Sequence, residues 1–235
     1  MRSIRLRIEF IVQRKSNIAI TITSTQSGDG KTFISTNMAA QYAMTGHPTV
    51  LLDMDIRKPN VHDKLGLETK VGVTNYLIGD CELDDIILRH PNLGFDVISA
   101  GTIPPNPGEL IRSDKLSELI RILRSKYEYI IVDSSPVGMV PDALALIEQT
   151  DVTLFVIRCM ETNKKFAEQT LQALSLNHKE KVSIVLSDVV PGGSGAGYGY
   201  GYGYGYGYGY GYGYGYGYGY GYGSGKRKRN TKYGK

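Results

Sequence analysis

The sequence predicts an α/β domain built on a doubly wound, mostly parallel β-sheet. Short β-branched runs alternate with helical patterns throughout residues 17–190. Several of these runs are apolar on both faces, as strands covered by helices on both sides must be. The first run ends in a glycine-rich turn that opens a helix, and such a sheet binds its ligands at this end of its strands.

Six strands are expected from runs rich in Val, Ile, Leu and Thr, which cover residues 17–23, 49–55, 95–101, 129–134, 152–158 and 182–188. Between them, apolar residues recur at three- and four-residue spacing, which predicts helices. These helical patterns cover residues 32–46, 113–128, 142–150 and 163–176. Ser113 suits a helix N-cap, and Gly46 suits a helix end.

Composition divides the chain into three parts. Residues 1–16 are expected to form a helical oligomerisation segment, residues 17–190 a folded domain, and residues 191–235 a disordered tail with a basic end. The tail contains six basic and no acidic residues, so the rest of the chain has a net charge of −2 although the whole chain has +4. We therefore expect no nucleic-acid partner.

The two cysteines, Cys81 and Cys159, match no metal or redox spacing, which favours ordinary thiols in a reducing compartment. No apolar run approaches the ~20 residues of a membrane helix. The N-terminus also lacks the apolar stretch of a signal peptide. These features predict a cytoplasmic location, with any membrane contact made through a partner.

The first strand is followed by STQSGDGKTF, which has the composition of a phosphate-binding loop. Gly28 and Gly30 allow backbone N–H groups to point at phosphate oxygens, and Lys31 supplies a positive charge. The Thr32 hydroxyl can ligate Mg²⁺, and the helix that starts here directs its positive dipole end at the anion. The expected nucleotide contacts are therefore Gly28, Asp29, Gly30, Lys31, Thr32 and Phe33. A strict phosphate loop has glycine at the position of Thr25, so a plain glycine turn is the alternative.

Two further strands end in acidic residues. Asp53 and Asp55 follow the second strand, and Asp133 follows a later one. Phosphoryl transfer needs Mg²⁺ held by carboxylates or water and a group that orients the nucleophile. We assign Asp55 and Asp133 with Thr32 to the metal, and Lys31, Asp53 and Asp55 to catalysis, with ATP and Mg²⁺ as cofactors. A lone Asp after a strand is more often a turn or helix cap.

These motifs resemble those of the bacterial tyrosine kinases of capsule and exopolysaccharide synthesis. The similarity covers nearly the whole chain and includes three nucleotide motifs, at residues 24–32, 50–57 and 130–136. SAGTIPPNPGELIRSDKL (residues 99–116) is a further telling segment. This chain departs from the family at three serines: the family usually has proline at the positions of Ser27 and Ser135, and commonly asparagine at that of Ser187.

The resemblance implies an ATP-dependent protein-tyrosine kinase that phosphorylates its own C-terminal tyrosines, between subunits, and regulates polysaccharide synthesis or export. The implied partners are further copies in a ring-like homo-oligomer, a membrane-spanning polysaccharide co-polymerase or adaptor, and a tyrosine phosphatase. The implied location is the inner face of the cell membrane, through a partner or an upstream membrane module.

Arg2 and Arg5 match the arginines of a family segment that docks one subunit on the next. The glutamate of that segment would precede Met1, so either the contact is weakened or an upstream segment is missing. A solvated basic terminus is the alternative.

The tail carries the expected phosphoacceptors, thirteen tyrosines that alternate with glycine. They are Tyr198, Tyr200, Tyr202, Tyr204, Tyr206, Tyr208, Tyr210, Tyr212, Tyr214, Tyr216, Tyr218, Tyr220 and Tyr222. Glycine on either side gives each ring freedom to enter a neighbouring active site. The alternatives are an aromatic segment that self-associates and a repeat whose length has no importance.

Two other functions compete with the kinase. One is a partitioning or positioning ATPase, which shares the paired aspartates and uses water as the nucleophile. The other is a non-catalytic scaffold whose tail only self-associates.

Overall fold

The computed structural model describes residues 1–13, 16–89, 92–178 and 181–189. The expected disordered tail and its thirteen tyrosines lie outside these residues, so the three-part division of the chain remains a prediction. In the described part, no helix combines the length and the apolar character needed to cross a membrane.

The described residues form seven strands and nine helices. The strands are β1 (Ile18–Ser24), β2 (Thr49–Met54), β3 (Ile87–Arg89), β4 (Asp96–Ile98), β5 (Tyr129–Ser134), β6 (Val152–Arg158) and β7 (Val182–Ser187). The helices are α1 (Arg2–Ile11), α2 (Lys31–Ala43), α3 (Val61–Leu65), α4 (Val73–Ile78), α5 (Leu83–Ile86), α6 (Pro107–Ile111), α7 (Asp114–Lys126), α8 (Asp142–Gln149) and α9 (Lys164–His178).

The strands lie in one sheet in the order β3-β4-β2-β5-β1-β6-β7. All neighbouring strands are parallel except β3 and β4, so the predicted doubly wound, mostly parallel sheet is confirmed. Strand β3 was not expected from the sequence, because its three residues follow α5 directly and no separate apolar run marks them. The expected Ser113 cap also differs in detail: Ser113 precedes α7, but its hydroxyl donates to the carbonyl of Leu110 at 2.7 Å rather than to the helix.

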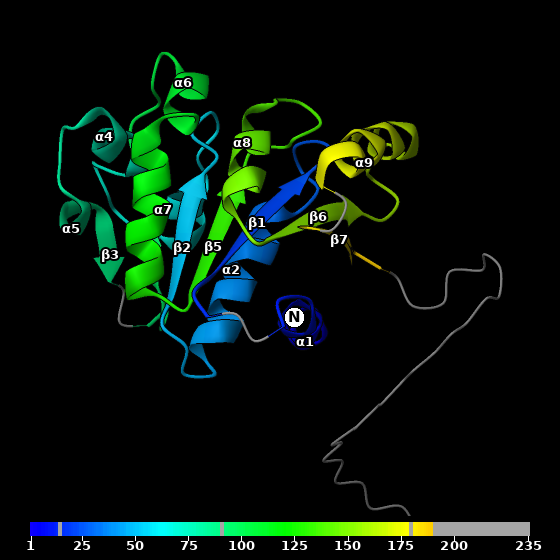
Figure 1. Ribbon diagram of the computed structural model, residues 1–235, viewed down its shortest axis with the longest axis horizontal. Coiled ribbons are helices and arrows are strands. Elements are labelled where there is room, and N and C mark those ends of the chain that lie inside the picture. The colour runs from blue at the N-terminus through cyan, green and yellow to red at the C-terminus, as the bar shows by residue number, and fades with distance from the viewer. Residues whose placement is uncertain (14–15, 90–91, 179–180, 190–235) are drawn as a thin grey trace, which may run out of the picture. The chain divides into compact units, whose positions relative to one another are not determined.

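Helices cover both faces of the sheet, with α2 on one side and α4, α7 and α8 on the other (Figure 1). Strand β5 shows why residues 130–132 are apolar at consecutive positions. Tyr129 and Ile131 join the core cluster that includes residues of α1 and α2, whereas Ile130 and Val132 join the cluster that includes α7. Alternate side chains of one strand therefore fill two different cores.

The register of three central strands places the motifs at one edge. Strand β5 lies between β2 and β1, and Asp133 pairs with Asp53 on one side and with Ile22 on the other. The loop after β1 and the acidic ends of β2 and β5 therefore meet at the carboxyl edge of the sheet. Since the strands are parallel, this convergence follows from the topology alone.

Gly138, in the turn after β5, packs directly against the base of the phosphate loop. A Cβ atom at this position would lie 2.4 Å from the backbone oxygen of Thr25. We expect Gly138→Ala to lower the free energy of unfolding by about 1–3 kcal/mol, because backbone must move to admit the methyl group. Thermal unfolding would measure the change. Met139→Ala, at an exposed neighbouring side chain, is the control and should change stability by less than about 0.5 kcal/mol. An unchanged melting temperature for Gly138→Ala would contradict the close approach.

Candidate active site

The phosphate loop, Ser24–Thr32, has the backbone that its glycines predict. Gly28 and Gly30 have φ angles of 90° and 99°, in the left-handed region that other residues rarely adopt. Gly30 is the N-cap of α2 and has no side chain to occupy the helix terminus. The first N–H groups of α2 are therefore available to an anion.

Lys31 is buried at the first position of α2, with 7% of its surface exposed. Burial lowers the pKa of its ammonium group, and the nearby carboxylates of Asp133 and Asp55 act in the opposite direction. Among the described residues, no carboxylate lies within 4.0 Å of the Lys31 ammonium to form an ion pair. The structure thus holds a buried cation close to the loop without a direct counter-ion.

Asp133, at the end of β5, is only 1% exposed, and burial raises its pKa to about 6. The Thr32 hydroxyl and the Lys31 ammonium oppose this shift, so both lie close to the carboxyl group. Its Oδ1 atom is buried and has no hydrogen-bond partner among the described residues. An orphaned buried carboxylate oxygen beside a threonine hydroxyl is the donor chemistry that Mg²⁺ or its water shell would complete.

The fit to Mg²⁺ depends on few protein ligands. No group of three or more His, Cys, Asp or Glu side chains in the described part of the chain has the arrangement of a metal site. Mg²⁺ commonly keeps several waters and binds through one or two carboxylates together with substrate phosphates. Thr32, Asp55 and Asp133 are therefore compatible with a magnesium ion that arrives with a nucleotide.

Asp53 occupies a different environment from Asp55. Its side chain is completely buried and accepts hydrogen bonds from the backbone N–H groups of Asp55 at 3.1 Å and Val61 at 3.3 Å. Burial, followed by the charge of Asp133, raises its pKa to about 8. Asp53, one of the expected catalytic residues, is therefore closed off from a ligand in this structure. Asp55 is half-buried and is better placed for such a contact.

The side chains of two other expected nucleotide contacts, Asp29 and Phe33, do not point at a phosphate site. The Asp29 carboxylate accepts the backbone N–H of Gln26 at 3.0 Å and the hydroxyl of Thr162 at 2.7 Å, so it shapes the loop. The Phe33 side chain is 62% exposed on the first turn of α2. Both residues therefore offer a ligand their backbone N–H groups rather than their occupied or outward side chains.

Several contacts that support the site were not predicted from the sequence. The Arg57 guanidinium donates from Nε at 2.8 Å and from Nη2 at 2.5 Å to the buried Asp142 carboxylate, which ties the segment after Asp55 to α8. Thr162 holds Asp29, and the Ser187 hydroxyl donates to the Asp29 carbonyl at 3.2 Å. These partners are 85 to 158 positions apart, and no local pattern predicts such contacts.

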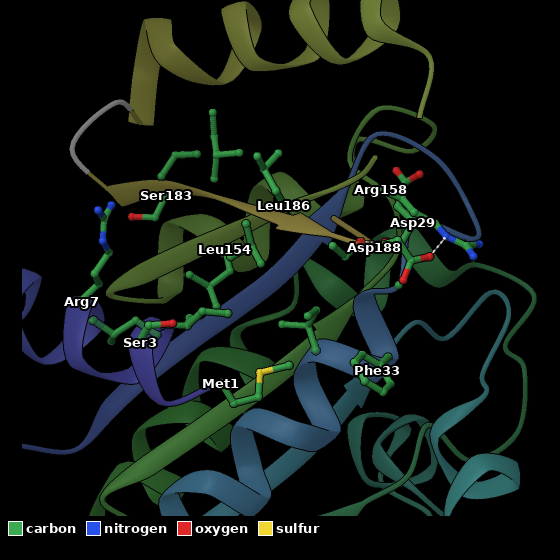
Figure 2. A pocket seen from close by; sticks show the side chains of 18 of the residues that line it. Met1, Ser3, Arg7, Asp29, Phe33, Leu154, Arg158, Ser183, Leu186 and Asp188 are labelled. Atoms are coloured by element: carbon green, nitrogen blue, oxygen red, sulfur yellow. Dashed lines mark hydrogen bonds and ion pairs between the residues drawn. The ribbon is translucent and has the colours of Figure 1, made fainter. Parts of the chain in front are cut away.

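A cavity of about 1000 Å³ lies beside the loop and extends between α1 and β7 (Figure 2). Gly28, Asp29 and Gly30 line it together with Arg158 and Asp188, which form an ion pair of 2.6 Å. The side chains of the three site aspartates after β2 and β5 are not part of its wall. The cavity offers room next to the loop for the part of a ligand that extends beyond its phosphates.

Arg2 and Arg5 lie on α1, which covers Arg2–Ile11 within the segment expected to be helical. Arg2 is exposed, whereas Arg5 is half-buried with its Nε 3.5 Å from a Glu9 carboxylate oxygen. Arg2 has no ion pair among the described residues and can meet another molecule, whereas Arg5 is paired within its own helix.

The buried Asp53 predicts a specific pH dependence of stability. The unfolded chain loses this proton near pH 3.8, whereas the folded protein keeps it to about pH 8. Between these values the folded state binds more protons, so stability falls as pH rises, by up to about 1.4 kcal/mol per pH unit. We expect the melting temperature of the magnesium-free protein to fall less steeply from pH 5 to pH 8 in Asp53→Asn than in wild type. Asp84→Asn, at an exposed carboxylate, should keep the wild-type slope. Equal slopes in wild type and Asp53→Asn would contradict the assignment.

Comparison with known proteins agrees with this geometry. The profile of the CobQ/CobB/MinD/ParA nucleotide binding domain matches residues 20–194. The chain is 34% identical over 174 residues to tyrosine-protein kinase YwqD of Bacillus subtilis (strain 168). The aligned residues cover 74% of this chain and 73% of that protein. It is 36% identical over 196 residues to tyrosine-protein kinase ptk of Acinetobacter johnsonii, which covers 83% of this chain and 27% of that protein.

Among solved structures, the kinase domain of the Escherichia coli tyrosine kinase ETK matches with a TM-score of 0.77 and 30% identity, covering 86% of this chain and 79% of that one. The chain spans about a quarter of the length of ptk and of several other curated relatives that it matches. The resemblance inferred from the nucleotide motifs is confirmed by these matches. Since they agree in sequence and in fold, the chain belongs to the bacterial tyrosine kinases within the CobQ/CobB/MinD/ParA nucleotide binding family.

Proposed function

We propose that this protein is an ATP-dependent protein-tyrosine kinase that phosphorylates the tyrosine run Tyr198–Tyr222 of another copy. The observation that carries the proposal is the cluster of buried Lys31, buried Asp133 and half-buried Asp55 at the phosphate loop, in which one Asp133 oxygen has no hydrogen-bond partner among the described residues. This cluster has the charges that a triphosphate with Mg²⁺ requires, and it lies in a chain that belongs to a tyrosine-kinase family.

The phosphate loop would bind the triphosphate through its backbone N–H groups from Gly28 to Phe33. Lys31 would contact the β- and γ-phosphates, where an anion would compensate its buried charge. Thr32, Asp55 and Asp133 would hold the magnesium ion, directly or through water. When bound, Mg²⁺ neutralises charge that develops on the phosphate oxygens.

The transfer itself needs a proton acceptor near the tyrosine hydroxyl. In the reaction, a bond forms between the tyrosine oxygen and the γ-phosphorus while the bond from that phosphorus to the bridging oxygen of ADP breaks. The phenolic proton leaves to a carboxylate, and we assign this role to Asp55 because it is the more exposed of the two aspartates after β2. Asp53 would support Asp55 by accepting its backbone N–H.

The burial of the other tyrosines supports the tail as the acceptor. Within the described part of the chain, tyrosine occurs at four positions: Tyr42, Tyr76, Tyr127 and Tyr129. All four are at most 8% exposed. A buried ring cannot enter a neighbouring active site, whereas glycine-spaced tyrosines in the tail have the backbone freedom to do so.

The wider setting is part of the same proposal. We expect homo-oligomerisation through α1 with Arg2 at the contact, a membrane-spanning polysaccharide co-polymerase or adaptor as activator, and a tyrosine phosphatase that reverses the modification. The domain would act in the cytoplasm at the inner face of the membrane and regulate capsule or exopolysaccharide synthesis. The names of the curated relatives support the kinase activity.

A nucleotide-switched positioning ATPase is the second candidate, and the match to the CobQ/CobB/MinD/ParA domain favours it. Its nucleophile would be water, so nucleotide turnover would not depend on the tail. The two functions therefore differ in whether the terminal phosphate reaches tyrosine or solvent.

Phosphate transfer from radiolabelled ATP with Mg²⁺ tests the proposal. We expect wild type to label the tail, and Lys31→Met to lose at least about a hundredfold in rate because it lacks the charge that meets the phosphates. A protein that ends at residue 190 should not label itself, but it should label the tail of added Lys31→Met protein. Circular dichroism would verify that each variant is folded.

The site of labelling decides the outcome. Replacement of all thirteen tail tyrosines of the run by Phe is the control for the acceptor. Retained labelling in Lys31→Met alone, or label confined to the four buried tyrosines, would contradict the proposal. Phosphate released to water at the same rate with and without the tail would favour the positioning ATPase.

A further inference from the structure

Ser135 lies two residues after Asp133, at the point where β5 leaves the sheet. It is 3% exposed, and Pro136 follows it. A residue before proline is restricted to extended backbone conformations, so the chain direction at Ser135 is constrained by its neighbour. The side chain is therefore presented from a narrow range of positions.

The backbone of Ser135 is also held by the adjacent strand. Its carbonyl oxygen accepts the hydroxyl of Thr23, on β1, at 2.9 Å. The same Thr23 oxygen accepts the backbone N–H of Val137 at 3.1 Å. The turn after β5 is thus fastened on both sides of Pro136 to the strand that carries the phosphate loop.

From this fixed position the Ser135 hydroxyl donates a hydrogen bond of 2.7 Å to Oδ1 of Asp55. Oδ1 also accepts a longer bond of 3.3 Å from the backbone N–H of Lys58. Among the described residues, no hydrogen bond to Oδ2 of Asp55 is present. One carboxylate oxygen is therefore held by the protein, and the other is left for a ligand.

We propose that Ser135 is a positioning residue that orients the Asp55 carboxylate toward the phosphate loop. The inference rests on the proposed function for its catalytic consequence, but the contact itself is independent of it. Without the hydroxyl, the Asp55 side chain loses the shortest hydrogen bond that it accepts from the described residues and gains rotational freedom. Its unbound oxygen then spends less time where Mg²⁺ and the acceptor hydroxyl would lie.

The first measurement needs no turnover. The affinity for ADP would be determined by calorimetry with and without Mg²⁺. The dissociation constant without Mg²⁺, divided by the dissociation constant with Mg²⁺, reports how well the protein holds the metal with the nucleotide. We expect Ser135→Ala to reduce this ratio several-fold and to leave the magnesium-free affinity for ADP unchanged, since the loop is untouched. Ser135→Thr keeps the hydroxyl and should retain the wild-type ratio.

The second measurement is the phosphorylation rate of the tail at saturating ATP and Mg²⁺. A lost hydrogen bond to a charged group predicts a fall in kcat of about tenfold to a hundredfold in Ser135→Ala, with rescue in Ser135→Thr. Ser99→Ala is the matched control. Ser99 is likewise a buried serine just after a strand, and its hydroxyl donates to the Val71 carbonyl, so the variant should keep wild-type values.

The outcomes test the positioning role of Ser135 separately from the proposed kinase function. An unchanged magnesium ratio in Ser135→Ala would overturn the positioning role, whatever the activity. Equal losses in Ser135→Ala and Ser135→Thr, or a loss of magnesium-free ADP affinity, would overturn it as well. A wild-type protein that shows the magnesium effect but labels no tyrosine would refute the kinase proposal and leave the role of Ser135 standing.

Discussion

Lys31 and Asp133 are both buried, and the fold keeps these two ionisable groups near each other without a direct ion pair. Burial disfavours the charged form of each, and the partner only partly offsets this effect. The site is therefore under electrostatic strain in the protein alone. A polyanion with a divalent cation would supply the missing negative charge near Lys31 and the missing partner of the Asp133 carboxylate. The folding of the sheet has already placed both groups, so ligand binding would not need to bring them together.

That assembly depends on the order of three strands. Because β5 lies between β2 and β1, Asp133 of β5 is in register with Asp53 of β2 on one side. On the other side it is in register with Ile22 of β1, the strand that leads into the phosphate loop. Second contacts then fix the details, as Arg57 anchors the segment after β2 to α8 and Thr162 anchors Asp29. The sheet places the groups within reach of one another, and these long-range polar contacts set their orientation.

The sequence predicts the sheet well because apolar runs and helical periodicity are local signals, and it predicts the phosphate loop because Gly28 and Gly30 are needed for its backbone angles. It could not separate the environments of Asp53 and Asp55, since two positions in one motif differ only in how the strand buries them. Ser135 and Asp142 carry no local signal of their roles, because their partners Asp55 and Arg57 are 80 and 85 positions away. Strand β3 continues directly from α5 and has no apolar run of its own, and the tail lies outside the described residues.

The burial of every tyrosine in the described part of the chain determines where the negative charge of phosphorylation would fall. Each phosphate adds about −1.5 to −2 units of charge, so a dozen of them would turn a slightly basic chain into a strongly anionic one. None of that charge would fall on a ring that packs in the core, such as Tyr42, which stacks on Tyr129 with ring centroids 3.6 Å apart. The net charge of the protein would therefore change strongly between the unphosphorylated and the phosphorylated state, while the packing of its folded interior stays the same.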